Sequence, residues 1–225
     1  MRDLVRVGTV SADPEKLLAA EAAAKLVEDG MLVGLGTGST VAFLLPALAA
    51  RGLDLRCVAT SPRTEAAARA LGMKVEPFHG ADALPRLDIA IDGADQVAPD
   101  GWLVKGGGAA HTREKAVAAA ADRFVVIVSS DKVVDALSPP VPLELLEYGL
   151  AGTLRRLGAV TLRDAPRSPD GGVIADYTDE FDEPSELAAR LSAAVGVVEH
   201  GLFPAEMVSD VVVGTGARVE TRSLR

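Results

Sequence analysis

The sequence has few of the residues on which several classes of protein depend. One of its 225 residues is cysteine, three are histidine and 4% are aromatic. A single cysteine excludes an intrachain disulfide and fits a reducing compartment. Cys57 lies in the strand-like run LRCVA, where we expect a small buried hydrophobe. His79, His111 and His200 show neither HxH nor HExxH spacing, so we expect no metal site and place all three at the surface or at caps.

Positive charge is also scarce. The chain holds 23 Lys and Arg against 32 Asp and Glu, a net charge of −9, which argues against nucleic acid as a partner. No run approaches the ~18 consecutive apolar residues of a membrane span. Residues 1–10 do not resemble a signal peptide, so we expect a cytoplasmic protein without a membrane partner. An anionic ligand would need a locally positive pocket, which gives weight to well-placed lysines.

Three common motifs are missing around the loop Gly36-Thr37-Gly38-Ser39-Thr40. No lysine follows its last glycine as in a P-loop, the spacing is not GxGxxG, and the serine is misplaced for GxSxG. A Gly/Ser/Thr loop between an apolar strand and an apolar helix nevertheless presents N–H groups and hydroxyls to a phosphate. The alternative is a plain strand-to-helix turn with a Ser or Thr cap.

Strand-like and helix-like runs alternate through the first 137 residues. We expect a helix from Asp13-Pro14, with Asp13 as its N-cap, to Gly30. Pro46 should kink or end the next helix early, and Ser61-Pro62 should open a third that Gly72 closes. Strands are expected at 31–35, 55–59, 73–77, 87–91 and 123–128, and a further helix at 112–122. This alternation predicts an α/β fold with a Rossmann-like, doubly wound, mostly parallel sheet.

The pattern changes at the proline-rich SPPVPLE (138–144). A helix at 143–157, strands at 159–163 and 173–177, a helix opened by Pro184-Ser185 and a strand near Val197 predict a smaller α+β (ferredoxin-like) domain over 138–206. The apolar run 210–213 is expected to rejoin the first sheet. The first domain would then comprise 1–137 and 207–225.

The most unusual stretch is IDGADQVAPDGWLVKGGGAAHTREK, residues 91–115, a largely polar segment between two buried strands. Asp92 and Asp95 follow a strand end, where open α/β sheets bind ligands; Lys105 and Glu114 complete the set. Taken singly, the aspartates suit a turn, Lys105 a solvated charge and Glu114 a helix start. Together they suit acid/base chemistry on a small phosphorylated molecule. The helix start should lower the pKa of Glu114 and keep it ionised.

Three segments carry a family resemblance: GLGTGST (34–40), DGADQV (92–97) and KGGGAAHTREK (105–115). In this order and spacing they resemble the signature loops of the A-type ribose-5-phosphate isomerases. Weaker likeness extends to SSDK (129–132), PDGGVIADY (169–177) and HGLF (200–203). The resemblance implies interconversion of D-ribose 5-phosphate and D-ribulose 5-phosphate through an enediolate in the non-oxidative pentose phosphate pathway, without a metal or other cofactor.

The resemblance also implies roles for individual residues. Glu114 would be the base, while Asp92, Asp95 and Lys105 would hold the sugar, assist ring opening and stabilise the enediolate. The substrate-binding residues would be Lys16, Thr37, Gly38, Ser39, Thr40, Gly93, Ala94, Gly106, Gly107, Gly108 and Lys132, with the phosphate near 37–40, Lys16 and Lys132. A homodimer or homotetramer is implied as well. The chain departs from the family at the domain boundary, where PLELLEY (142–148) replaces a Val-Glu-Val-hydrophobic-Pro run.

Two other functions remain open at this stage. A phosphosugar-binding regulatory module would keep the phosphate loop and the aspartates but would not need Glu114 or Lys105. Such a module usually carries a DNA-binding segment, and no basic helix-turn-helix is visible. A related sugar-phosphate deaminase or lactonase would have a catalytic histidine near the aspartate loop, and none is there.

Overall fold

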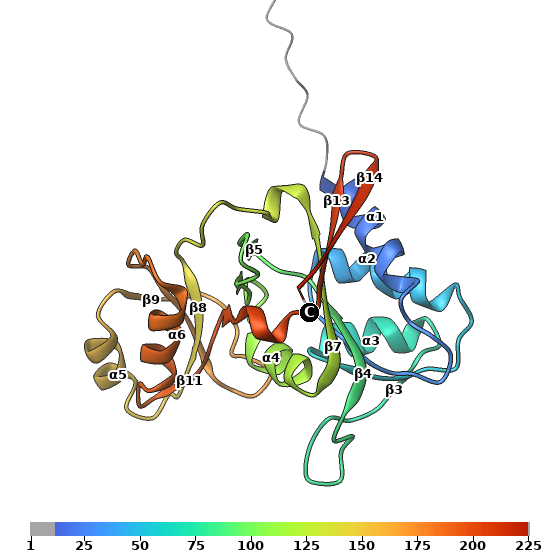
Figure 1. Ribbon diagram of the computed structural model, residues 1–225. Coiled ribbons are helices and arrows are strands. Elements are labelled where there is room, and N and C mark those ends of the chain that lie inside the picture. The colour runs from blue at the N-terminus through green and yellow to red at the C-terminus, as the bar shows by residue number, and fades with distance from the viewer. Residues whose placement is uncertain (1–11, 225) are drawn as a thin grey trace, which may run out of the picture.

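The computed structural model describes residues 12–224, so the expectation for residues 1–10 lies outside it. Its centre is a seven-stranded sheet in the order β14-β13-β7-β4-β1-β2-β3 (Figure 1). Every neighbouring pair is parallel except β13 and β14, which form an antiparallel hairpin. The strands are β1 (Leu32–Leu35), β2 (Arg56–Ala59), β3 (Lys74–Val75), β4 (Leu87–Asp92), β7 (Ala121–Ser129), β13 (Asp210–Thr215) and β14 (Arg218–Ser223). The predicted mostly parallel α/β sheet is confirmed.

Helices cover both faces of this sheet because successive strand side chains point to opposite sides. Ile89 and Ile91 of β4 pack with buried residues of α1 (Ala12–Ala24) and α2 (Ser39–Ala49). Ala90 between them packs on the other side with Val117 of α4 (His111–Ala119). The third helix, α3, spans Pro62–Ala70 and begins at the predicted cap, because Ser61 Oγ accepts a hydrogen bond from Thr64 N (3.2 Å).

Both predicted ends of the first helix are wrong, and of the two outcomes expected at Pro46, a kink or an early end, the early end does not occur. Asp13 lies inside the first turn of α1 rather than at its N-cap, and the helix ends at Ala24, before Gly30. Pro46 does not end α2, which continues to Ala49. The buried side chains of Leu44, Leu45 and Leu48 lie on both sides of the proline in sequence, and burial of this kind overrides a local penalty.

A smaller antiparallel sheet has the order β11-β8-β10-β9. Its elements are β8 (Val141–Leu145), α5 (Leu150–Leu157), β9 (Val160–Leu162), β10 (Val173–Tyr177), α6 (Pro184–Ser192) and β11 (Val197–His200). The helix predicted at 143–157 is therefore wrong in its first part. Residues 141–145 form a strand with β10 on one side and β11 on the other, and all five are buried. The order becomes β-α-β-β-α-β, the ferredoxin-like arrangement.

A third sheet of very short strands was not predicted. It has the order β12-β6-β5, from β5 (Gln96–Val97), β6 (Leu103–Val104) and β12 (Leu202–Phe203). Two short 3₁₀ turns, η1 (Ser130–Lys132) and η2 (Ala205–Met207), complete the elements. Helix α4 lies between the large and the small sheet (Figure 1). Within residues 12–224, no helix is both long and apolar enough to cross a membrane.

Candidate active site

The site is built where β1 and β4 end side by side. Asp92 is the last residue of β4, and its Oδ1 accepts hydrogen bonds from Thr37 N (2.9 Å) and Gly93 N (2.7 Å). Gly36 allows this close approach, because a Cβ at that position would lie 2.0 Å from Asp92 Oδ1. The carboxylate thus fixes the start of the Gly36–Thr40 loop, a role that its position in the sequence did not show.

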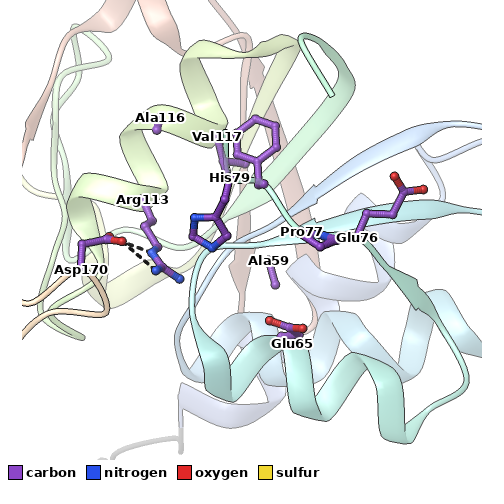
Figure 2. A pocket seen from close by; sticks show the side chains of 10 residues that line it. Ala59, Glu65, Glu76, Pro77, His79, Arg113, Ala116, Val117 and Asp170 are labelled. Carbon is purple, nitrogen blue, oxygen red and sulfur yellow. Dashed lines mark hydrogen bonds and ion pairs between the residues drawn. The ribbon is translucent and has the colours of Figure 1, made fainter. Parts of the chain in front are cut away.

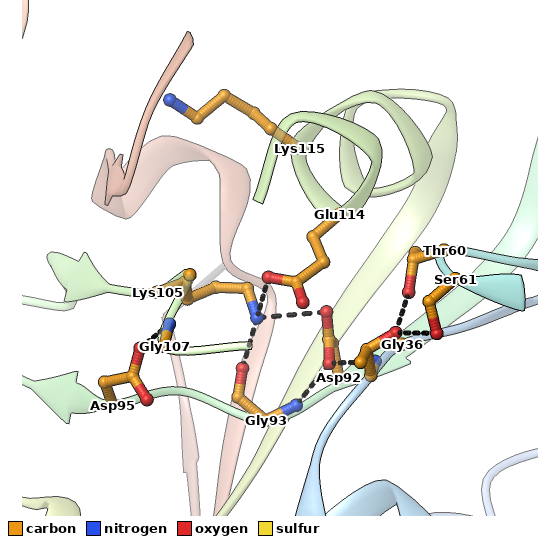
Figure 3. A network of polar contacts seen from close by, with 12 residues as sticks. Gly36, Thr60, Ser61, Asp92, Gly93, Asp95, Lys105, Gly107, Glu114 and Lys115 are labelled. Atoms are coloured by element: carbon orange, nitrogen blue, oxygen red, sulfur yellow. Dashed lines mark hydrogen bonds and ion pairs between the residues drawn. The ribbon is translucent and has the colours of Figure 1, made fainter. Parts of the chain in front are cut away.

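Lys105, directly after β6, brings its ammonium group to the Asp92 carboxylate. Its side chain is 2% exposed, and its Nζ lies 3.0 Å from Asp92 Oδ2 and 3.1 Å from Glu114 Oε2 (Figure 3). The same Nζ donates to Gly93 O. Those two carboxylate oxygens are buried and have no partner in hydrogen-bond geometry, so the ammonium holds them as an ion pair. A solvated Lys105 is excluded.

The pKa of Glu114 differs from the sequence-based expectation. Burial, together with the negative charge of Asp92, raises the pKa of Glu114 to about 8, although Lys105 opposes the shift. Glu114 is 4% exposed, so loss of hydration outweighs the helix start. The prediction that Glu114 is permanently ionised is wrong, and its pKa instead suits a group that gains and loses a proton near neutrality.

The pKa values of the other two members of the cluster are also raised, each by a different balance of effects. Burial would lower the pKa of Lys105, but Asp92 and Glu114 outweigh it and raise that pKa above its usual value. Burial raises the pKa of Asp92, against the effects of Lys105 and of the N–H groups of Gly93 and Thr37. Glu114 has no such backbone donors to its carboxylate. Glu114 is the member of the cluster whose pKa is raised to near neutrality.

A cavity of about 190 Å³ opens in front of this cluster. Every predicted site residue lines it except Asp92, which lies behind Lys105. The lining residues are Lys16, Thr37, Gly38, Ser39, Thr40, Gly93, Ala94, Asp95, Lys105, Gly106, Gly107, Gly108, Glu114, Asp131 and Lys132. Asp131 is the one member of the lining that the sequence did not suggest.

The glycine-rich segment after Lys105 forms one wall. Asp95 Oδ2 accepts a hydrogen bond from Gly107 N (2.7 Å), and a Cβ on Gly107 would lie 2.7 Å from Asp95 Oδ1. Gly106 has φ of 103°, a conformation that favours glycine. Gly107 thus lets the backbone pass directly over the Asp95 carboxylate, and Gly106 lets it pass over the ring of His111.

The opposite end of the cavity is formed by the start of α2. Gly38 is the N-cap residue and no side chain caps this helix, so the plain Ser or Thr cap considered from the sequence does not occur. Thr37 Oγ1 lies 2.7 Å from Thr60 Oγ1 and 2.9 Å from Ser61 Oγ. These hydroxyls hold Thr37 from beneath, a contact that sequence reasoning missed.

Glu15 is a second residue that sequence reasoning missed. Its Oε2 accepts hydrogen bonds from Ser130 N (3.0 Å) and Ser130 Oγ (2.7 Å), and its Oε1 accepts one from Gly216 N (2.7 Å). These bonds, first the one from Gly216, lower the pKa of Glu15. They tie α1 to the turn that carries Lys132. Nothing in the sequence distinguishes this glutamate from a surface residue of a first helical turn.

Two histidines are buried, contrary to expectation. His111 is 0% exposed and packs under Gly106, and neither ring nitrogen has a hydrogen-bond partner. Burial lowers its pKa to about 4. His200 is also buried, with Nε2 2.9 Å from Ser192 Oγ. Cys57 is buried as expected, and burial raises the pKa of its thiol to about 12. Residues 12–224 contain no group of three or more His, Cys, Asp or Glu that could hold a metal ion.

A second cavity, of about 260 Å³, lies between α3 and α4 (Figure 2). Its charged side chains are already paired: Arg113 with Asp170 at 2.7 Å, and Glu65 with Arg69 at 2.8 Å. None of the predicted site residues lines it. The smaller cavity beside Lys105 is therefore the candidate active site.

Comparison with known proteins identifies the family. A family model described as ribose 5-phosphate isomerase A (phosphoriboisomerase A) matches residues 56–218. Ribose-5-phosphate isomerase A of Caulobacter vibrioides is 45% identical over 222 residues, which cover 92% of this chain and 96% of that protein. The crystal structure of ribose 5-phosphate isomerase A from Neisseria gonorrhoeae has a TM-score of 0.89 at 30% identity, covering 96% of this chain and 98% of the other. A D-ribose-5-phosphate isomerase solved with phospho-erythronic acid has a TM-score of 0.84 at 34% identity, covering 92% and 97%.

Proposed function

Because this chain belongs to the ribose-5-phosphate isomerase A family, we propose that it interconverts D-ribose 5-phosphate and D-ribulose 5-phosphate by proton transfer in the non-oxidative pentose phosphate pathway. One observation carries the proposal. A buried lysine holds two carboxylates, and one of these, Glu114, has a pKa raised to about 8 beside a cavity suited to a phosphosugar.

Glu114 is the proposed base. As a carboxylate it removes the proton from C2 of the open-chain aldose, and as an acid it returns that proton to C1 of the enediolate. The electron pair of the broken C–H bond moves into the C1–C2 bond as the carbonyl oxygen O1 gains negative charge. When C1 takes up its proton, the hydroxyl proton on O2 passes to O1 and O2 becomes the carbonyl oxygen of the ketose. A base works best when its pKa lies near the working pH, and the burial of Glu114 provides that match.

Lys105 is the proposed stabiliser of the developing negative charge. Its pKa is raised, so its ammonium is present throughout the reaction, and it is fixed before the substrate arrives. A preorganised cation in a water-poor site stabilises an oxyanion far more than the same cation in water. Asp92 holds Lys105 from behind, and Asp95 is placed to bind sugar hydroxyls and to assist ring opening.

The phosphate is proposed to bind at the start of α2, around 37–40. Backbone N–H groups at a helix start favour an anion. Lys16 and Lys132 line the same cavity and supply positive charge in a chain of net charge −9. Gly93, Ala94 and the three glycines after Lys105 form the walls around the sugar.

The domain division and the assembly of copies are part of the same proposal. We infer a small α+β domain at 138–206 and a catalytic domain formed by 1–137 and 207–225. All four strands of the small sheet fall within 141–200, while β13 and β14 belong to the large sheet. We also propose a homo-oligomer, because Tyr148 is 95% exposed and Val195 80% exposed. A cytoplasmic location stays a prediction from the sequence.

The test is an isomerase assay with ribose 5-phosphate in the presence of EDTA, using the native chain and Glu114→Gln. The native chain should form ribulose 5-phosphate and incorporate solvent deuterium at C1 or C2. Glutamine keeps the size but cannot accept the proton, so kcat should fall by ~10²–10⁴.

Substrate should still protect the Glu114→Gln variant against thermal unfolding. Turnover within about tenfold of native would make Asp92 or Asp95 the candidate base. Loss of native activity in EDTA, with recovery on adding a divalent ion, would replace proton transfer by a metal-assisted hydride shift. A chain that binds the sugar phosphate without converting it would be a regulatory module.

A further inference from the structure

Arg163 links the small sheet to the active-site loop. It follows β9, and its guanidinium makes a two-pronged pair with Asp176 of β10, with Nε–Oδ2 at 2.7 Å and Nη2–Oδ1 at 2.6 Å. The remaining nitrogen, Nη1, donates to the carbonyl oxygens of Gly106 (3.0 Å) and Gly107 (3.2 Å). The Arg163 side chain is mostly buried between Asp176 and the glycine loop. One guanidinium therefore joins two consecutive glycine carbonyls to a fixed carboxylate.

These bonds determine where the loop N–H groups point. In a planar trans peptide the C=O and the following N–H point in opposite directions. The Gly106 carbonyl faces Arg163, so the N–H of Gly107 faces away from it, toward Asp95 Oδ2 (2.7 Å). The Gly107 carbonyl also faces Arg163, which turns the N–H of Gly108 away from the guanidinium.

The loop has little rigidity of its own. Glycine loses more conformational freedom on ordering than any other residue, and this segment has three in succession. Charged donors make the stronger hydrogen bonds, and a peptide whose carbonyl accepts such a bond becomes a better N–H donor through polarisation. A cation behind the carbonyls thus orders the loop and strengthens its donors.

We propose that Arg163, held by Asp176, is a positioning residue that fixes the peptide groups of Gly106 and Gly107, and through them Asp95 and the Gly108 N–H, against the sugar. The inference rests on the proposed isomerase function. Arg163 does not line the cavity, so it acts through the loop. Because the phosphate end is formed by other elements, loss of Arg163 impairs turnover more than phosphate binding.

The experiment compares Arg163→Met with Arg123→Met. Arg123 also pairs with a carboxylate, through one hydrogen bond to Asp210 (2.8 Å), and does not line the cavity. Misplacing a donor in an active site costs ~10- to 100-fold in rate. Arg163→Met should therefore lower kcat by ~10- to 100-fold while KM for ribose 5-phosphate and inhibition by inorganic phosphate stay near native. Arg123→Met should keep native kcat.

Two further variants separate positioning from general stability. Arg163→Lys keeps the charge but loses the forked geometry, so it should fold and still show a lowered kcat. Arg163→Ala should regain activity when guanidinium is added at low millimolar concentration, and Arg123→Met should not respond. A native kcat in Arg163→Lys and Arg163→Met would overturn the inference, as would equal losses in the Arg123 control. If the native chain itself fails to isomerise ribose 5-phosphate, the proposed function fails instead.

Discussion

At the scale of single residues, the site depends on burying three ionisable groups together. Lys105 is enclosed between Asp92 and Glu114. Removing one member of such a set leaves an uncompensated buried charge, which costs far more than the loss of a surface pair. The arrangement is costly for folding and useful for chemistry, because enclosure raises the pKa of Glu114 to about 8.

The pH dependence of kcat/KM tests the raised pKa of Glu114. The raised pKa means that Glu114 is protonated below about 8 and ionised above it. Only the carboxylate accepts a proton, so kcat/KM should rise with pH through about 8 and then level off. Measurement from pH 6 to 9.5 at constant ionic strength gives the midpoint. The substrate phosphate titrates near ~6, so a rise centred there, with no change near 8, would contradict the assignment.

At the scale of elements, the loop at the start of α2 and the turn η1 form the end of the cavity that is proposed to bind the phosphate. Glu15 joins α1 to that turn, and Thr37 rests on hydroxyls from the start of α3. The helices and strands were largely predictable because the spacing of apolar residues along the sequence differs between a helix and a strand. Residues 141–145 were misassigned because the apolar run is short and fits a helix or a strand equally well.

Thr40→Val and Lys132→Ala test the phosphate end. Thr40 and Lys132 line the cavity there, and the phosphate changes little during the reaction. Both substitutions should mainly raise KM for ribose 5-phosphate, with a smaller fall in kcat. Lys74→Ala removes an exposed lysine paired with Asp54 (2.6 Å) and should leave both constants unchanged. A large fall in kcat at constant KM in both variants would show that these residues do not hold the phosphate.

At the scale of the whole molecule, the two most exposed large apolar side chains, Tyr148 and Val195, belong to segments next to the small sheet. Leu146 N donates to Gly196 O (2.9 Å), which brings Leu146 beside Val195, and Tyr148 follows two residues later. Large exposed apolar side chains that cluster mark interaction surfaces. Leu146 and Tyr148 lie in the segment 142–148, where the chain departs from the family pattern.

Light scattering tests whether this surface joins copies of the chain. The native protein should have a mass two or four times that of one chain. Tyr148→Asp combined with Val195→Asp places charges in the contact and should yield monomers. Leu224→Asp, at an exposed apolar residue near the other end of the chain, is the matched control and should keep the native mass. Unchanged mass in the double variant would place the contact elsewhere.

Local patterns in the sequence were enough to predict the alternation of strands and helices, the mostly parallel sheet and most of the residues that line the cavity beside Lys105. These follow from local patterns: apolar periods, glycines where the backbone must turn, and polar residues at strand ends. The surroundings of each ionisable side chain depend on tertiary packing and could not be predicted from local patterns. Tertiary packing enclosed Lys105 and Glu114, buried His111 and His200, and brought Arg163 to glycines more than fifty residues away. The pKa of Glu114 could not be predicted locally, because desolvation depends on every element packed around the carboxyl.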